Sequence, residues 1–225
     1  MTSDRRQFIL AGGATVAGLL TPVAAVAQPA VKAKAFIADH EKVVKPLEIR
    51  SALAWWEANI SGRDDDFKKK EEAQNAIDAV LSDKDKFASL KGIKEARDKG
   101  GIEDKLLARQ IDLLYLQYLE KQVDPEVLKK INAKSNAVEQ TFNVYRAKVD
   151  GSELPDSRVR AILKDSVDSA QRKKVWEASK GVGAAVEADL KELVKLRNEA
   201  AKQLGFKNFH ALTLTLNEQN GDELI

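Results

Sequence analysis

Residues 102–123 read IEDKLLARQIDLLYLQYLEKQV, and an Asp-Pro pair follows them at 124–125. Apolar or aromatic residues in this stretch recur at spacings of 4, 3 and 4 along the chain: Leu107, Ile111, Leu114 and Tyr118. That period places them on one face of an α-helix, so the stretch predicts a helix with a single apolar stripe. Gly100-Gly101 before it and Asp124-Pro125 after it mark its ends.

The Asp124-Pro125 pair also opens the next predicted helix. Asp124 is a favoured N-cap, and Pro125 suits the first turn, where no intrahelical partner awaits its missing N–H. A helical period then continues to Val149, where Asp150-Gly151 predicts the end of the helix, through Ile131, Ser135, Val138, Phe142, Tyr145 and Val149.

The remaining segments follow the same pattern. Helices are expected at 35–60 on both sides of Pro46, from Asp64 onward, from Pro155 to about Ser166, at 168–180 and at 182–204. The acidic run 64–66 is interpreted as a helix cap and not as a metal site, because acids in a first turn oppose the helix dipole. No useful stretch alternates as a strand does, so the predicted fold class is all-α, an antiparallel helical array.

Composition narrows the possible functions. The chain has 225 residues, 37 Lys+Arg against 35 Asp+Glu, a net charge of +2 and no Cys. So balanced a charge argues against nucleic-acid binding. Without Cys there is no disulfide framework, no thiolate metal site and no cysteine nucleophile.

The N-terminus resembles an export leader. Arg5 and Arg6 precede Phe8 as in a twin-arginine signal, and no charge occurs from Gln7 to Val31. Ala25 and Ala27 form the small-x-small pattern that signal peptidase accepts, which predicts cleavage after Ala27. Residues 1–27 are therefore interpreted as the export signal and residues 28–225 as the mature helical part. The predicted location is the periplasm or the extracellular space.

An uncleaved membrane anchor is the alternative interpretation of this leader, although its many Gly, Ala and Thr residues insert weakly into a bilayer. The export machinery is thus an expected partner, and no stable membrane association is expected after cleavage.

The two histidines give little support for a metal site within this sequence. His40-Glu41 begins like the zinc motif H-E-x-x-H, but Val44 occupies the second histidine position. We interpret His40 as a solvated helix residue and expect His210 to pack beside Phe206 and Phe209. No G-x-S-x-G elbow and no glycine-rich phosphate loop is present. No catalytic residue and no metal ligand is assigned to this chain.

Two positions depart from the helical pattern. Arg197 falls near the centre of an apolar face formed by Val186, Leu190, Leu193, Ala201 and Leu204. It is expected either to pair with a carboxylate or reach water, or to serve as an anion site. Trp55 and Trp56 point about 100° apart on a helix, so at least one is expected to pack in the core while the other lies at the rim of a groove.

The C-terminal third resembles the angiotensin-converting-enzyme family of zinc peptidases. The resemblance rests on Trp176, Gly183, Arg197, Asn198 and Glu199, within the segments Val175-Trp176-Glu177, Val182-Gly183, Leu196 to Ala201, Leu204 to Phe206 and Asn208-Phe209. Ala52 to Ile60 is similar to the family's early lid helix. These residues are expected to act structurally. The resemblance implies a two-lobed helical peptidase that uses zinc to remove short C-terminal pieces, commonly dipeptides, from oligopeptides, and in which this part supplies the lid and one channel wall.

The sequence also departs from that family. Its H-E-x-x-H motif and later glutamate match nothing here, so zinc is expected only in an intact parent protein and this chain alone is expected to be inactive. The chain is interpreted as an incomplete N-terminal part of the peptidase-like domain, ending at Asp222 to Ile225. The stretch 212–216 lacks the family's Arg, which puts chloride activation in doubt. A non-catalytic helical binding or scaffold protein of the periplasm, or an inactive homologue that regulates a relative, stays open.

Overall fold

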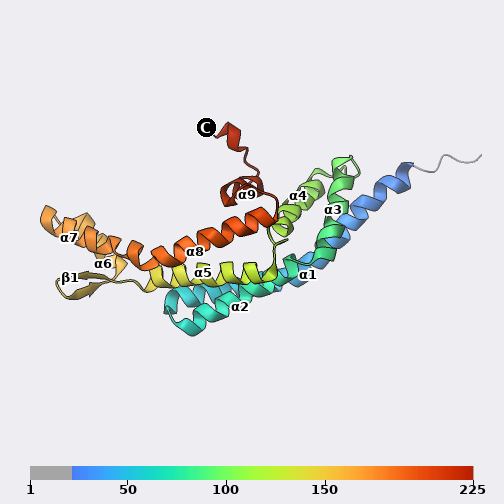
Figure 1. The fold of residues 1–225 in the computed structure, drawn as a ribbon. Coiled ribbons are helices and arrows are strands. Elements are labelled where there is room, and N and C mark those ends of the chain that lie inside the picture. The colour runs from blue at the N-terminus through green and yellow to red at the C-terminus, as the bar shows by residue number, and fades with distance from the viewer. Residues whose placement is uncertain (1–21, 225) are drawn as a thin grey trace, which may run out of the picture.

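A computed structural model describes residues 22–224. Figure 1 shows an architecture built almost entirely of helices, which confirms the predicted all-α fold class. The elements are α1 (Pro22–Ser61), α2 (Asp64–Leu81), α3 (Lys84–Asp98), α4 (Lys105–Glu120), α5 (Pro125–Val144), β1 (Ala147–Val149), β2 (Ser152–Leu154), α6 (Asp156–Asp165), α7 (Ser169–Lys180), α8 (Val182–Gln203), α9 (Phe209–Leu216) and a 3₁₀ turn at Gly221–Glu223.

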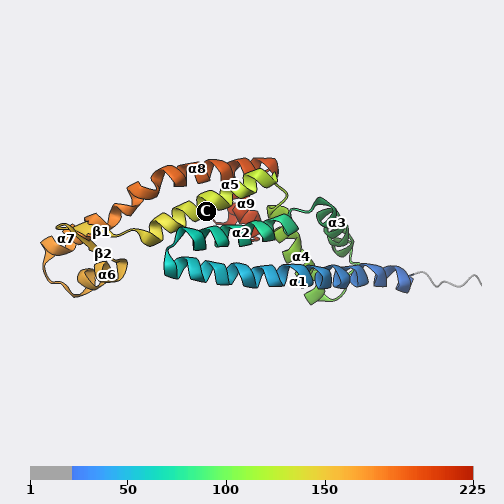
Figure 2. The same cartoon turned by 90° about the horizontal axis from the view of Figure 1, so that it is seen from below.

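Four long helices form the body of the molecule. α1 packs along α2, α2 against α5, and α5 against α8. Successive members of this series run in opposite directions, as the colours in Figure 2 show, so the array is antiparallel as predicted. α3 and α4 lie across one end of α1, while β1, β2, α6 and α7 form the opposite tip (Figure 1).

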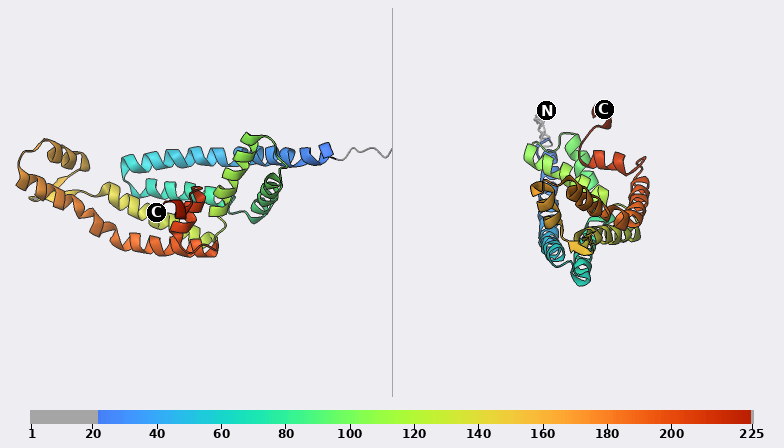
Figure 3. Two further views of the ribbon diagram at one scale, coloured as in Figure 1. Left: turned by 90° about the horizontal axis from the view of Figure 1, so that it is seen from above. Right: turned by 90° about the vertical axis from the view of Figure 1, so that its left-hand side faces the viewer.

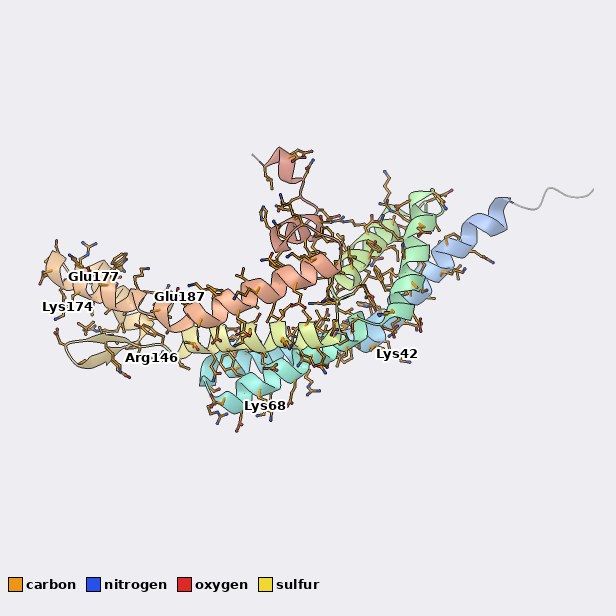
Figure 4. All side chains as sticks on the ribbon, viewed as in Figure 1. Lys42, Lys68, Arg146, Lys174, Glu177 and Glu187 are labelled. Atoms are coloured by element: carbon orange, nitrogen blue, oxygen red, sulfur yellow. The ribbon has the colours of Figure 1, made fainter. Side chains whose placement is uncertain are left out.

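The apolar residues gather in three separate clusters instead of one central core. The largest joins α1 to α2, α3 and α4 through fully buried side chains that include Val44, Leu81, Leu90, Ile111 and Tyr118. A second joins the start of α5 to the end of α8, and a third lies beneath the hairpin at the tip. Charged side chains such as Lys68 and Glu187 cover the outer faces (Figure 4). This distribution gives an elongated body with space between the helices.

Aspartate caps fix several of the predicted helix starts. The Asp124 carboxylate accepts a 2.7 Å hydrogen bond from the Glu126 N–H, and Pro125 occupies the first turn of α5. Asp168 caps α7 in the same manner. Such caps satisfy N–H groups that have no partner within the helix. The starts of α5 and α7 are therefore where the sequence predicts them.

The predicted end of the second helix is wrong. α5 stops at Val144, and Asp150-Gly151 instead forms the two-residue turn between β1 and β2, with Val149 paired to Ser152. Both turn residues have positive φ, 53° for Asp150 and 77° for Gly151. A type I′ hairpin requires this conformation at both positions, and Asp-Gly is one of its preferred pairs. The same dipeptide is typical of helix ends and of hairpins, which explains the error.

The acidic run 64–66 occupies the first turn of α2, where it opposes the helix dipole as predicted. No side chain caps this helix at its N-cap residue, Arg63. The Asp66 carboxylate, which is 4% exposed, instead accepts hydrogen bonds from the side chains of Ser61 (2.8 Å), Arg63 (2.9 Å) and Lys69 (3.0 Å). These hydrogen bonds lower the pKa of Asp66 far below its ordinary value. Asp66 therefore stabilises the turn between α1 and α2.

The described residues leave the leader untested. Arg5 and Arg6 lie outside them, while Ala25 and Ala27 fall within the first turns of α1. Within residues 22–224, no helix has both the length and the apolar character that crossing a membrane requires.

Two glycines at the junction between α7 and α8 differ in the space around them, which predicts different effects of substitution. A Cβ atom on Gly181 would overlap the Tyr145 hydroxyl oxygen, which is held in place by its 2.9 Å hydrogen bond to the Ala178 carbonyl. Gly183 has open space around it. We expect Gly181→Ala to lower the free energy of unfolding by about 1–3 kcal/mol through steric overlap. Gly183→Ala should be neutral or stabilising by up to ~1 kcal/mol, because alanine favours a helix.

Urea unfolding followed by circular dichroism checks both variants. Equal stability of the two would contradict the tight packing at Gly181.

Candidate functional site

A groove of about 640 Å³ lies between the helices. α1 and α8 contribute opposite edges, α2 and α5 line it between them, and α4 and α9 border one end. The end-on view in Figure 3 shows how the ribbons of these helices are placed around one another. Its lining combines apolar and charged side chains, namely Glu48, Ser51, Ala52, Trp55, Lys70, Gln74, Ile77, Asp78, Glu120, Lys121, Leu128, Ile131, Asn132, Ser135, Asn136, Arg197, Ala200, Phe209 and Leu212. We call this space the interhelical groove.

A buried carboxylate lies at the base of the interhelical groove. Asp78 of α2 is 4% exposed and accepts hydrogen bonds from Asn132 of α5 (2.7 Å) and Gln74 (3.1 Å). The Lys121 ammonium lies 3.4 Å from Oδ1 of this carboxylate, the oxygen that accepts from Gln74, and 3.3 Å from Glu120. Burial disfavours the charged form of Lys121, but these two carboxylates outweigh burial and raise its pKa. Asp78 thus links α2 and α5 to the end of α4.

A second polar group joins α1, α2 and α5. Lys70 donates hydrogen bonds of 2.5 Å to both the Glu139 carboxylate and the Asn136 side-chain oxygen, and Asn59 of α1 donates one of 2.9 Å to Glu139. Burial works to raise the pKa of Glu139, but the bonds from Lys70 and Asn59 prevail and lower it. The charge of Lys70 is therefore already balanced within the protein.

The corner between α8 and α9 carries two of the predicted residues. The Arg197 guanidinium carbon lies 5.2 Å from the centre of the Phe209 ring, an arrangement that a cation–π attraction stabilises. Asn198 accepts a 2.9 Å hydrogen bond from the Phe209 N–H, which fixes the first turn of α9 against α8. Arg197 faces the interhelical groove, and among the described residues no carboxylate lies within 4 Å of it. The expected pairing with a carboxylate is thus not observed there.

The other predicted residues are not brought together. Trp176 is 51% exposed on α7 with the Lys180 ammonium over its ring, and Gly183 and Glu199 are exposed on α8. The tight glycine of this segment is Gly181, which sequence reasoning missed because its neighbour Tyr145 is 36 residues away.

The expectation for the tryptophan pair was wrong. Trp55 is 49% and Trp56 is 59% exposed, so neither packs in the core. Trp55 does line the interhelical groove, as expected for one member of the pair. On this helix the buried positions go to small side chains such as Ala58, which let α2 approach closely.

Sequence reasoning also missed Lys70 and Asp78. With Phe67, Gln74 and Leu81 they follow one another at helical spacing on α2, so a polar group interrupts the inward face of that helix. Polar residues on an otherwise apolar helix face were the sequence signal that could have revealed Lys70 and Asp78.

The histidines also differ from expectation. His40 is half-buried and not fully solvated: its Nδ1 lies 3.1 Å from the Tyr118 hydroxyl oxygen of α4, with which it is hydrogen-bonded, and the centroids of the two rings are 5.6 Å apart. His210, expected to pack beside phenylalanines, is exposed. Across residues 28–224, no three His, Asp or Glu side chains form a group that could hold a metal ion. The described residues therefore do not provide a donor set that fits zinc.

Comparison with known proteins identifies the family. The peptidase family described as angiotensin-converting enzyme matches residues 27–221, so the chain belongs to that family. The match includes every element that lines the interhelical groove. No curated protein and no solved structure gives a significant match.

The pKa of His40 predicts how the stability of the fold depends on pH. Burial lowers its pKa and outweighs the opposing effect of Glu48 and Glu41, while Lys86 adds to the lowering. The unfolded chain therefore binds a proton more readily than the folded chain, and stability should decline as the pH falls below about 6.5. We expect His40→Gln to flatten this decline between about pH 7 and pH 5.

The matched control is His210→Gln, which should retain the decline because His210 is exposed. The urea midpoint of each variant, measured across this pH range, gives the decline in stability. If stability declines with falling pH as steeply in His40→Gln as in the unmodified chain, His40 is not the cause.

Proposed function

We propose that this chain forms the lid and one wall of the substrate channel of an exported zinc peptidyl-dipeptidase, which hydrolyses oligopeptides near their C-terminus. The observation that carries the proposal is the family match across residues 27–221. The interhelical groove supports it, because an extended cleft lined by apolar groups and a few polar side chains suits a peptide.

The residues of this chain would bind and position the peptide. Apolar side chains from α5 and α9, namely Leu128, Ile131 and Leu212, offer contacts for apolar side chains of the substrate. Trp55, on the exposed edge formed by α1, is placed to cover a ligand in the groove. Zinc, when bound in the intact enzyme, would supply an activated water, and we propose that its ligands come from residues outside this sequence.

The proposed export rests on the leader. Arg5-Arg6 and the Ala25-Val26-Ala27 pattern support transport followed by cleavage, and the family match begins at residue 27, beside the proposed cleavage site. The mature protein would then act in the periplasm or outside the cell.

A non-catalytic helical binding protein is the second candidate. The observation in its favour is that the charges of Lys70, Asp78 and Lys121 find partners within this chain, so these three charges need no other domain to balance them. An inactive homologue that regulates a full-length relative is a variant of this candidate.

Metal content and peptidase activity of this chain test where the catalytic zinc ligands lie. We predict that the purified chain, incubated with zinc and dialysed, retains no stoichiometric zinc and hydrolyses no oligopeptide. Mass spectrometry of the metal content and chromatography of a peptide mixture provide the measurement. Stoichiometric zinc together with peptide cleavage would overturn the proposal that the catalytic ligands lie outside residues 1–225.

Export is tested by replacing both arginines with lysine. Arg5→Lys/Arg6→Lys keeps the positive charge of the leader but removes the twin-arginine pair, so the protein should accumulate uncleaved in the cytoplasm. The unmodified chain should appear in the periplasmic fraction with Gln28 as its first residue. Fractionation and N-terminal sequencing check both, and undiminished export of the lysine variant would argue against this route.

A further inference from the structure

One cation of the interhelical groove differs from the others. Lys70 is paired with Glu139, and Lys121 lies beside Asp78 and Glu120. For Arg197, the residues described in the structure supply neither a carboxylate within 4 Å nor a hydrogen-bond acceptor for its guanidinium. Its charge is therefore available to a ligand in the groove.

The surroundings of Arg197 hold it in a defined position. The side chain is half-buried, and its guanidinium lies over the Phe209 ring. Phe209 is fixed in turn by the hydrogen bond between its N–H and Asn198, the residue next to Arg197. Stacking uses the face of the guanidinium, whereas its N–H donors project from the edge. The donors thus stay free while the side chain is preorganised.

We propose that Arg197 is the anchor for a carboxylate group of a peptide bound in the interhelical groove. The proposal rests on the proposed function, because it takes a peptide as the ligand. A guanidinium matches a carboxylate with two parallel hydrogen bonds, and partial burial strengthens them. The carboxylate is either the C-terminus of the peptide or an acidic side chain, and both present the same two oxygens.

The groove lining near Arg197 is apolar, which favours peptides with an apolar side chain next to the bound carboxylate. Ala200 lies one helical turn further along α8, and Leu128 packs with it in the apolar cluster between α5 and α8. Leu212 of α9 lines the same groove. A carboxylate flanked by an apolar side chain therefore fits this end of the groove best.

Glu48 provides the matched control. It lines the groove from α1, is exposed and, within the described structure, is in no ion pair. Glu48→Gln raises the charge of the groove by one unit and Arg197→Gln lowers it by one unit, on the opposite edge.

The experiment titrates the purified 225-residue chain with three peptides in a calorimeter at low ionic strength. The first is acetyl-Ala-Leu-Ala-Leu-amide, the second is the same peptide with a free C-terminal carboxylate, and the third is acetyl-Ala-Leu-Glu-Leu-amide. We expect at least one carboxylate-bearing peptide to bind ~tenfold more tightly than the neutral one, because hydrogen bonds to charged groups are the strong ones.

Arg197→Gln should abolish this preference, Arg197→Lys should retain part of it, and Glu48→Gln should keep it. Circular dichroism verifies that each variant is folded. A preference for only the second peptide identifies the C-terminus as the group bound, and a preference for only the third identifies the side chain.

Three outcomes would overturn the inference. If all three peptides bind equally, or if the preference survives Arg197→Gln, Arg197 is not the anchor while peptide binding by the groove still stands. If none of the peptides binds, the groove is not a peptide site, and the proposed function fails together with the inference.

Discussion

The buried carboxylate of Asp78 is the constraint on which the arrangement of the helices depends. A charge that is 4% exposed is tolerated only where neighbours compensate it, and Asn132, Gln74 and Lys121 do so here. Because these partners come from α2, α5 and the end of α4, the carboxylate fixes how those elements meet. Loss of one partner would leave an uncompensated charge and would loosen the whole junction.

The interhelical groove follows from this construction. Polar contacts lie at its base, two of the three apolar clusters contribute to its lining, and the third lies at the tip, so no single central core fills the space between α1 and α8. The chain belongs to the angiotensin-converting-enzyme family, and we propose that the groove binds a peptide. The free guanidinium of Arg197, held over Phe209, then gives one end of it a chemical preference.

Local signals in the sequence predicted most of the helices, because caps such as Asp124 and Asp168 act within a few residues. The hairpin at 147–154 was missed since Asp150-Gly151 suits two kinds of turn. His40 and Asp78 were misjudged or overlooked because their partners, Tyr118 and Asn132, lie 78 and 54 residues away. The sequence revealed Arg197 as unusual, but only the fold showed that no carboxylate approaches it among the described residues.

The most direct test of this account is native-state hydrogen exchange of the purified chain, compared with Asp78→Ala. The account predicts slow exchange in the middle of α2, α5 and α8, and a marked acceleration across all three helices in the variant. Rapid and uniform exchange in the unmodified chain, or acceleration confined to the residues beside position 78, would contradict the claim that this buried carboxylate holds the groove together.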